Sequence, residues 1–354
     1  MKIHLALLEN DKSYLNRIIS VFNTKYADKL EIYSFTEKQT ALSALRAYRI
    51  DVLLAGESFD IEREEVPPRC GFAYLVDTAD IESVRGEAAL CKFQKAELIY
   101  KQILSIFSDK TSAITGVGSE HAQGGKVIAF FSVSGGTGCS TAAAAGAIFL
   151  ARKGKKVLYL NLETFGNPDL FFQGEGHGTF EDIIYAVKSK KSNLYLKLES
   201  VVRRDETGVF FFSKTPVALD MNELKEEEIR RIVAEARTSC EYEYIILDMA
   251  FSFQKERLGQ FCECSQVVMV SDGSVISNNK AERMLEALEI MERQQDKNLL
   301  GRLCILYNRF SSHTSEKFKN RDIHEIGGIK RYEGYEIKDL LQELSRLPVF
   351  DSII

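Results

Sequence analysis

Residues 127–151 constrain the fold most strongly, because an apolar run, a glycine-rich loop and a helical pattern follow one another closely. The run VIAFF (127–131) is typical of a buried strand, SGGTGCST (134–141) follows it, and AAAAGAIFLA (142–151) predicts a helix. Glycines let backbone N–H groups converge on an anion, and the N-terminus of a helix adds its positive dipole end. The stretch therefore predicts an α/β domain with a phosphate-binding loop.

Composition limits the class of protein. A chain of 354 residues is long for a single core, so two domains are expected. The formal net charge of −5 argues against broad nucleic-acid binding. No apolar run reaches the roughly 18 residues of a transmembrane helix, and the N-terminus lacks a signal-peptide cleavage pattern. The seven cysteines are scattered and odd in number, which favours reduced thiols. We therefore expect a cytoplasmic protein.

A stretch rich in Gly, Ser and Thr, residues 108–125, is typical of a flexible linker. It divides the chain into a domain at 1–107 and a domain at 126–354. In both, short apolar runs alternate with helical patterns over short connections, which predicts parallel sheets covered on both faces. The expected fold class is two doubly wound α/β domains, the first flavodoxin-like and the second of the P-loop NTPase type.

The expected elements are as follows. Strands are predicted at 2–9, 30–35, 51–56, 71–76, 126–133, 156–162, 208–213, 243–249, 266–272 and 302–308, and helices at 13–22, 37–48, 95–107, 139–152, 223–237 and 278–293.

The loop carries hydroxyls but no lysine. Ser140 stands where a hydroxyl binds Mg²⁺, Thr141 stands where a second hydroxyl reaches a phosphate, and Cys139 stands where such loops carry a lysine. Backbone amides make most of the cradle, so loss of the lysine weakens the site without deleting it. A thiol at a helix N-terminus is either a redox-sensitive group or a small neutral substitute, and the second interpretation is favoured.

Residues 125–310 resemble, in order, the MinD/ParA family of ATPases, whose loop reads K-G-G-x-G-K-[ST]-[ST]. The corresponding residues are Ser134, Gly135, Gly136, Thr137, Gly138, Cys139, Ser140 and Thr141. Both family lysines are replaced, the signature lysine by Ser134 and the loop lysine by Cys139. The resemblance implies a site for ATP and Mg²⁺ in this loop.

The resemblance also assigns roles to later residues. Glu163 takes the position of the acid that orients the attacking water, with Asn161 in place of the preceding aspartate. Asp248 takes the position of the acid that holds Mg²⁺ together with Ser140, and Asn308 that of the adenine-reading asparagine. From the residues alone, Asp248 could instead cap a turn, and asparagine is common at strand ends.

Hydrolysis is expected to be slow at most. Lysines and arginines neutralise the charge that develops on the phosphate oxygens during transfer, and both loop lysines are missing. Arg309, Arg203, Arg204 and Lys214 are the candidate replacements. The alternative is a nucleotide site kept only for its fold.

Residues 1–107 resemble the receiver domains of response regulators. The acid pair of receivers becomes Glu9 and Asn10, the phosphoacceptor aspartate falls on Gly56, and Lys95 stands in the lysine position. Glycine offers no carboxylate, so phosphoryl transfer to this position is impossible. The expected role of this domain is protein interaction or dimerisation.

A receiver-like domain followed by a MinD/ParA-type ATPase is similar to the TadZ/CpaE family. That resemblance implies an ATP-linked homodimer that acts as a localisation or scaffold factor for Flp/Tad-type pilus assembly. Its partners would be pilus and secretion proteins at the cell pole, and any membrane association would be indirect.

Three other ATPase classes remain open. A DNA-partitioning ATPase needs a basic surface, whereas the mildly basic segment 309–331 reads as a solvated loop. A MinD-like membrane-cycling ATPase needs a basic amphipathic tail, whereas this chain ends in a helix of mixed charge. An iron-protein-like ATPase needs cysteines at fixed positions, which the spacing here does not identify.

Overall fold

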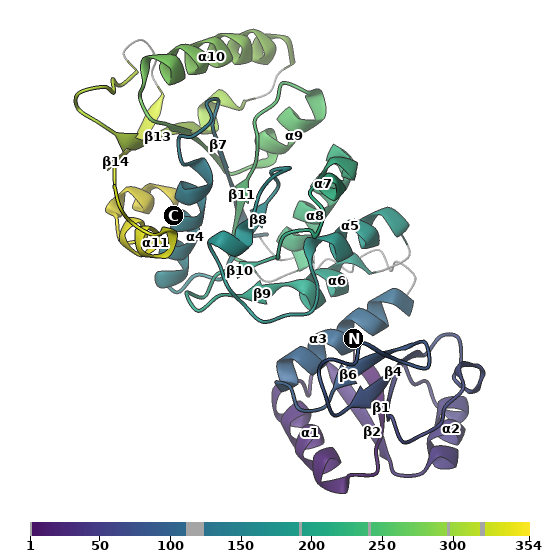
Figure 1. The fold of residues 1–354 in the computed structure, drawn as a ribbon. Helices are drawn as coiled ribbons and strands as arrows, with labels where there is room; N and C mark the ends of the chain where they lie inside the picture. Colours follow the sequence, from purple (N-terminus) through teal and green to yellow (C-terminus); the bar gives the residue numbers. More distant parts are fainter. Residues whose placement is uncertain (1, 111–123, 191–192, 240–241, 296–297, 319–322) are drawn as a thin grey trace. The chain divides into compact units, whose positions relative to one another are not determined.

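The computed structural model describes residues 2–110, 124–190, 193–239, 242–295, 298–318 and 323–354. Their contacts divide the chain into two compact units, each built on its own sheet (Figure 1). Unit 1 comprises Met1–Val117, Gly176–Gly178 and Tyr185–Val201, and unit 2 comprises Gly118–Glu175, Thr179–Ile184 and Val202–Ile354. Most of the predicted linker lies outside the described residues, and its first residues, 108–110, end a helix.

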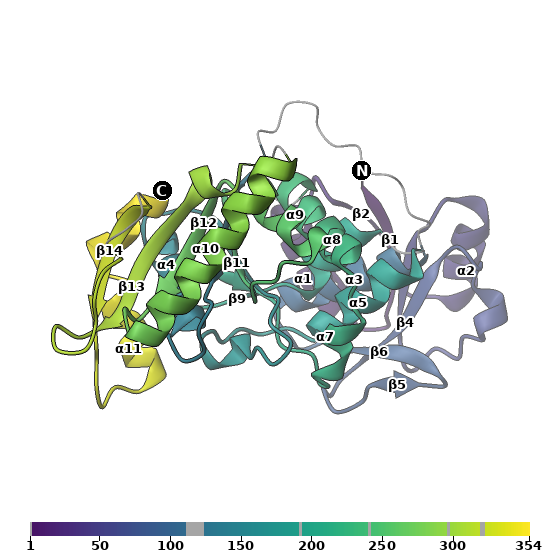
Figure 2. The same cartoon turned by 90° about the horizontal axis from the view of Figure 1, so that it is seen from above.

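Unit 1 has the order β1(Ile3–Leu8), α1(Lys12–Lys25), β2(Leu30–Phe35), α2(Lys38–Ala47), β3(Val52–Gly56), η1(Arg63–Glu65), β4(Gly71–Val76), β5(Ser83–Val84), β6(Glu87–Cys91) and α3(Ala96–Lys110). The sheet order is β2-β1-β3-β4-β6-β5, parallel except for β5. Helices α1 and α3 pack on one face and α2 on the other (Figure 2). This is the flavodoxin-like order that was predicted.

A hairpin follows β4 where a doubly wound fold would place a further helix. Strands β5 and β6 pair antiparallel through a turn at Arg85 and Gly86, whose φ angles are 54° and 82°. Two consecutive positive φ angles are typical of a tight hairpin turn, and glycine adopts them without strain. Among the described residues, the core on the face that such a helix would cover is completed by α2 and by Ile61, Val66 and Cys70 of the segment before β4, and Val84 of the hairpin packs against it.

One helix of unit 1 comes from the later sequence. Helix α6(Leu194–Val201) packs on α3, and Leu196 joins the core formed by α1, α3 and the sheet. Lys197 is 4% exposed, and its amine contacts the Asp109 carboxylate at 3.0 Å and the Ser105 hydroxyl at 2.9 Å. Residues 185–201 therefore belong by contact to unit 1, although they follow the glycine loop in the sequence.

Unit 2 is a larger sheet of order β14-β13-β12-β7-β11-β8-β10-β9, parallel except for β9. Its strands are β7(Lys126–Phe131), β8(Val157–Asn161), β9(Arg203–Arg204), β10(Phe210–Phe211), β11(Tyr244–Asp248), β12(Gln266–Ser271), β13(Leu303–Phe310) and β14(His324–Lys330). Its helices include α4(Cys139–Arg152), α7(Leu219–Glu223), α8(Glu226–Ser239), α9(Lys255–Glu263), α10(Val275–Gln295) and α11(Ile337–Leu344), and α5(Phe180–Ser189) begins in this unit and ends in unit 1. The short helices are η2(Pro168–Leu170), η3(Leu300–Arg302) and η4(Pro348–Ile353).

Helix α4 is buried against the sheet, with α11 and η4 beside it, and α8, α9 and α10 lie on the opposite face (Figure 1). The alanines of α4 let it approach closely, because they are buried and offer no bulk. A Cβ at Gly146 would lie 3.2 Å from Ile353 and 3.4 Å from Phe130 and Phe350. The helix that starts at the glycine loop is thereby fixed on both sides.

The prediction of a solvated loop at 309–331 is wrong in part. Residues 324–330 form β14, which pairs parallel with β13 at the edge of the sheet. Two glycines and alternating polar residues hide this strand in the sequence. Gly327 has a φ of 140°, and the pairing with β13 is irregular on both sides of it. Among the described residues, no helix combines the length and the apolar character that crossing a membrane requires.

Candidate nucleotide site

The glycine loop joins β7 to α4 at the carboxyl edge of the sheet. Gly136 and Gly138 have φ angles of 80° and 79°, a region that favours glycine. A Cβ at Gly135 or Gly136 would meet no described atom within 4 Å, so these two glycines border open space. The first N–H groups of α4 have no intrahelical acceptor and are available to an anion in that space.

Side chains from β13 support the loop from beneath. The Asn308 amide donates a hydrogen bond to the Thr137 carbonyl at 2.8 Å, and the Arg309 guanidinium donates to the Gly136 carbonyl at 2.7 Å. A Cβ at Gly138 would lie 2.5 Å from the Asn308 amide nitrogen, so only glycine allows this approach. Arg309 itself has a φ of 58°. Both predicted residues thus contact the loop, and the adenine-reading role of Asn308 stays a prediction.

Asp248 ends β11 and is fully buried. One carboxylate oxygen, Oδ2, accepts hydrogen bonds from the Tyr159 hydroxyl at 2.7 Å and the Asn161 amide at 2.9 Å. The other, Oδ1, has no hydrogen-bond partner among the described residues. Burial and the nearby Glu163 carboxylate raise the pKa of Asp248 to about 7. Because Asp248 and Glu163 are close and one oxygen of Asp248 is unpartnered, a bound cation would stabilise the two carboxylates.

The predicted metal and catalytic residues meet here. The Ser140 hydroxyl, in the first turn of α4, donates to Glu163 at 3.3 Å. The Glu163 N–H donates to the Asn161 side-chain carbonyl at 3.2 Å. The turn is closed by a hydrogen bond from the Gly166 N–H to the Glu163 carbonyl at 3.1 Å. Ser140, Glu163 and Asp248 therefore form one cluster at the loop. Their spacing in the sequence alone does not show this.

Tyr159 is a member of this cluster that sequence reasoning missed. It is fully buried on β8, and burial together with the Asp248 charge raises its pKa well above the usual value. The phenol therefore remains a hydrogen-bond donor to Asp248 at neutral pH. The only sequence signal was a tyrosine inside the otherwise aliphatic run of a buried strand.

The remaining hydroxyl and thiol side chains of residues 134–141 differ in their environments. Ser134 and Thr137 are buried, and their hydroxyl oxygens have no hydrogen-bond partner in the described part of the chain. Unpartnered buried hydroxyls fit a ligand with acceptor oxygens, such as a phosphate. Burial and the charges of Asp248 and Glu163 raise the pKa of the Cys139 thiol well above its usual value. The thiol is therefore neutral, which disfavours the redox interpretation. Thr141 lies beside Ser140 in the first turn of α4.

The four candidate cations lie in three places. Arg309 reaches the loop, as described above. Lys214 is exposed and lines a small pocket together with Glu163. Arg203 and Arg204 lie on the edge strand β9, where the Arg204 guanidinium stacks over the Phe210 ring at 5.5 Å. Arg309 and Lys214 are thus the cations that the structure brings to the glycine loop and to Glu163.

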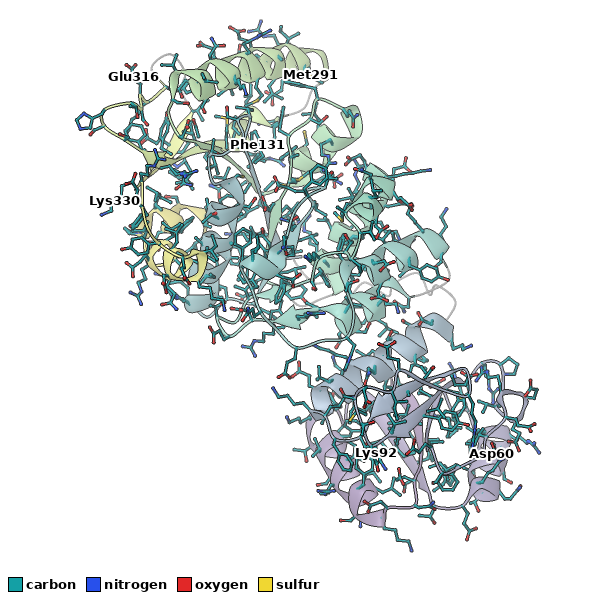
Figure 3. All side chains as sticks on the ribbon, viewed as in Figure 1. Asp60, Lys92, Phe131, Met291, Glu316 and Lys330 are labelled. Atoms are coloured by element: carbon teal, nitrogen blue, oxygen red, sulfur yellow. The ribbon has the colours of Figure 1, made fainter. Side chains whose placement is uncertain are left out.

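The receiver-like site of unit 1 is occupied by its own side chains. Glu9 is 4% exposed, and its carboxylate contacts the Lys92 amine at 3.3 Å, while that amine also contacts Asp77 at 2.6 Å. Lys92 is labelled among the side chains of unit 1 in Figure 3. A Cβ at Gly56 would lie 2.9 Å from the Glu9 carboxylate. The assignment of the lysine position to Lys95 was therefore wrong, because the lysine that reaches the acid is Lys92, directly after β6.

Comparisons with known proteins agree with this architecture. Residues 1–108 match the family model of the TadZ-like receiver domain, and residues 125–300 match that of an AAA domain. A ParA family ATPase from Chlorobium tepidum is similar in structure, with 21% identity, a TM-score of 0.52, and coverage of 65% of this chain and 98% of that one. No curated protein matches the chain.

A second solved structure is the septum site-determining protein MinD from Pyrococcus horikoshii, complexed with Mg-ADP. It is 14% identical, with a TM-score of 0.49, and the match covers 64% of this chain and 95% of that one. At 21% identity the ParA family structure shows the fold alone, and together with the two mostly parallel sheets it confirms the fold class predicted from the sequence. The two family models together cover most of the chain, so the chain is similar to a TadZ-like receiver domain followed by an AAA domain.

Proposed function

We propose that this protein binds ATP and Mg²⁺ at the glycine loop, hydrolyses ATP slowly at most, and forms an ATP-linked homodimer. In this proposal the dimer is a localisation or scaffold factor for Flp/Tad-type pilus assembly. The observation that carries the nucleotide part is the Asp248 cluster. A fully buried carboxylate with an unpartnered oxygen stands beside a second acid and a hydroxyl, at the start of a helix that follows a glycine loop.

These residues fit the proposed ligands. Ser140 and Asp248 supply the oxygen atoms that Mg²⁺ prefers, and the N–H groups of the loop and α4 suit phosphate oxygens. Bound Mg²⁺ would supply charge neutralisation between the acids and the phosphates. Glu163 can accept a proton from a water molecule, since its carboxylate is held by Ser140 and its backbone by Asn161.

The positions of the cations support slow turnover. Cys139 brings no charge into the loop, and Arg309 already donates to the Gly136 carbonyl. Lys214 is exposed near Glu163, where solvent screens its charge. With no lysine at either family position, stabilisation of the transferred phosphoryl group is weak. The protein would then act through the free energy of ATP binding and not through rapid hydrolysis.

Exposed apolar side chains support a dimer. Phe165, Phe253 and Val275 follow β8, β11 and β12, and Phe165 and Val275 are 87% and 76% exposed. Because the carboxyl ends of parallel strands share one edge, these side chains lie on the edge that carries the glycine loop. Large apolar groups gathered on one edge are typical of an interaction surface. A second copy covering this edge would bury them beside the nucleotide.

The pilus role rests on the TadZ-like match of residues 1–108. Unit 1 supports a binding module and not a phosphorylation switch, because Gly56 has no carboxylate and Glu9 and Lys92 neutralise each other within the site. Localisation at a cell pole through pilus and secretion partners follows from this family alone.

Calorimetry with ATP and Mg²⁺, run beside light scattering, tests the nucleotide and dimer parts. We expect binding together with a doubling of mass, and weaker binding for Ser140→Ala. Absence of binding at millimolar ATP would contradict the nucleotide site. Binding without a change of mass would contradict the dimer.

A further inference from the structure

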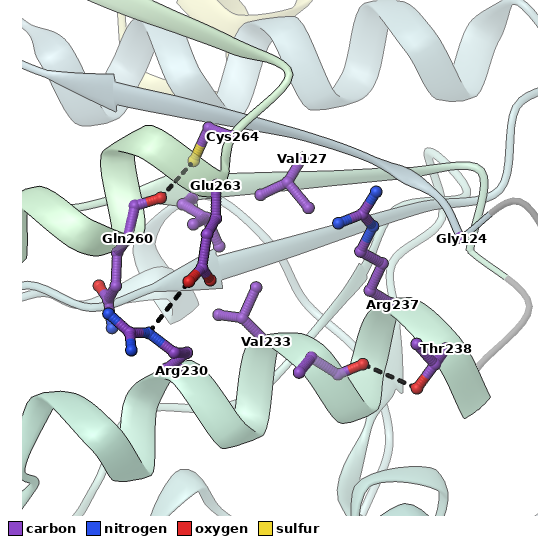
Figure 4. A pocket seen from close by; sticks show the side chains of 11 residues that line it. Gly124, Val127, Arg230, Val233, Arg237, Thr238, Gln260, Glu263 and Cys264 are labelled. Atoms are coloured by element: carbon purple, nitrogen blue, oxygen red, sulfur yellow. Dashed lines mark hydrogen bonds and ion pairs between the residues drawn. The ribbon is translucent and has the colours of Figure 1, made fainter. Parts of the chain in front are cut away.

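A second cavity lies in unit 2 between α8 and α9, on the face of the sheet opposite α4 (Figure 4). Its volume is about 190 Å³, and apolar side chains form much of its wall, among them Val127, Val233 and Leu247. None of its lining residues belongs to the glycine loop or the Asp248 cluster. It is therefore a separate site.

Most polar groups of the cavity already have partners. The Thr238 hydroxyl donates to a backbone carbonyl of α8 at 2.9 Å, and the Cys264 thiol donates to one of α9 at 3.3 Å. The Arg230 guanidinium contacts the Glu263 carboxylate at 3.3 Å (Figure 4). These four side chains shape the wall and offer little to a ligand.

Two polar groups remain. Gln260 is 4% exposed and donates its amide to the Glu226 carbonyl at 3.3 Å, which leaves its carbonyl oxygen buried and unpartnered among the described residues. If the Gln260 amide were flipped, its oxygen would face the Glu226 carbonyl oxygen, and two acceptors would repel each other. The unpartnered atom is therefore the side-chain oxygen and not the nitrogen. Arg237 lines the cavity from the last turn of α8, is exposed, and has no ion pair within the described residues. Its guanidinium extends toward Val127 (Figure 4).

We propose that this cavity binds a small organic carboxylate with an apolar body and a hydrogen-bond donor. The carboxylate would pair with Arg237, the body would fill the space beside Val127 and Val233, and the donor would satisfy Gln260. A cavity of about 150 Å³ holds a benzene molecule, so the volume here suits one substituted ring.

The probe is 4-hydroxybenzoate, titrated calorimetrically into the full chain without nucleotide. Its ring, hydroxyl and carboxylate match the three features of the cavity. We expect a dissociation constant of about 0.1–1 mM, the range for a ligand of this size. Benzoate lacks the donor and 4-hydroxybenzyl alcohol lacks the charge, and each should bind about tenfold more weakly.

Two matched pairs of variants locate the binding. Arg237→Gln should weaken 4-hydroxybenzoate about tenfold, whereas Arg231→Gln, an exposed arginine of the same helix outside the cavity, should leave it unchanged. Val233→Phe should abolish binding by filling the space, and Ile290→Phe on the exposed face of α10 should not.

The proposal fails if none of the three compounds binds. It also fails if Arg237→Gln and Arg231→Gln bind equally, or if Val233→Phe retains binding. The arginine pair keeps the test decisive even if the phenylalanine variant does not fold.

Discussion

Replacement of Asp248 by asparagine should make unit 2 less sensitive to pH. In the folded chain, burial and Glu163 raise the pKa of this carboxyl from 3.8 to about 7. Below about pH 4 the carboxyl is protonated in the folded and the unfolded chain, so its pKa shift does not change the free energy of unfolding there. Between pH 4 and 7 the unfolded chain ionises first, and folded stability falls as the pH rises. Above pH 7 the penalty is complete.

The size of the effect follows from the shift. About three pKa units correspond to about 4 kcal/mol at full ionisation, and about 2.5 kcal/mol of this develops between pH 5 and 8. For a unit of this size, each kcal/mol changes the melting temperature by about 2–4 °C. The melting temperature of Asp248→Asn minus that of the wild type should therefore be about 5–10 °C larger at pH 8 than at pH 5.

The assay is calorimetric melting of both proteins from pH 5 to 8 in EDTA, which removes divalent cations. Asp272→Asn is the control, since this acid directly follows β12, another parallel strand of the same sheet. Burial opposes its ionisation, but hydrogen bonds from Ser277 and Ser274 outweigh burial and lower the pKa of Asp272. Its effect should be nearly constant over this range, because loss of that stability lies at lower pH. If the difference in melting temperature between Asp248→Asn and the wild type were the same at pH 5 and at pH 8, the electrostatic reasoning would be refuted.

Three further changes test the site, the receiver-like unit and the dimer edge. Cys139→Lys should raise ATP hydrolysis at least tenfold in a phosphate-release assay, and an unchanged rate would show that the missing lysine does not limit turnover. Gly56→Asp should not gain phosphorylation from acetyl phosphate, because Glu9 occupies the space beside it; labelling seen by intact-mass spectrometry would contradict this. Phe165→Ser should weaken the ATP-dependent dimer about tenfold by sedimentation, whereas Tyr335→Ser, an exposed aromatic after β14, should not.

The nucleotide loop could be read from the sequence because each of its features is local. Glycines at 136 and 138 meet a backbone requirement, and the helix and strand beside them carry strong apolar patterns. The order of the parallel strands then brings Asp248 and Glu163 to the same edge. What the sequence could not give was which oxygen of Asp248 is left free, since that depends on a tyrosine from another strand.

Other features were missed because their signals are not local. Strand β14 is stabilised by pairing with β13 and carries two glycines, so its own sequence gives little periodicity. Lys92 follows β6 directly and points back into the site, whereas Lys95 lies just before the first turn of α3. The end of β6, which fixes the place of Lys92, follows from its pairing with β5 in a hairpin and with β4 in the sheet, and a hairpin was not expected there.

The packing of α6 on α3 has a consequence for synthesis of the chain. Residues 1–110 can form a sheet and its helices early, but the apolar and charged contacts around Leu196 and Lys197 arise only after about 90 more residues have been made. By then β7, α4 and β8 have also left the ribosome. The two units must therefore finish folding in an interleaved order, and a gene truncated after codon 110 would leave a surface of α3 uncovered.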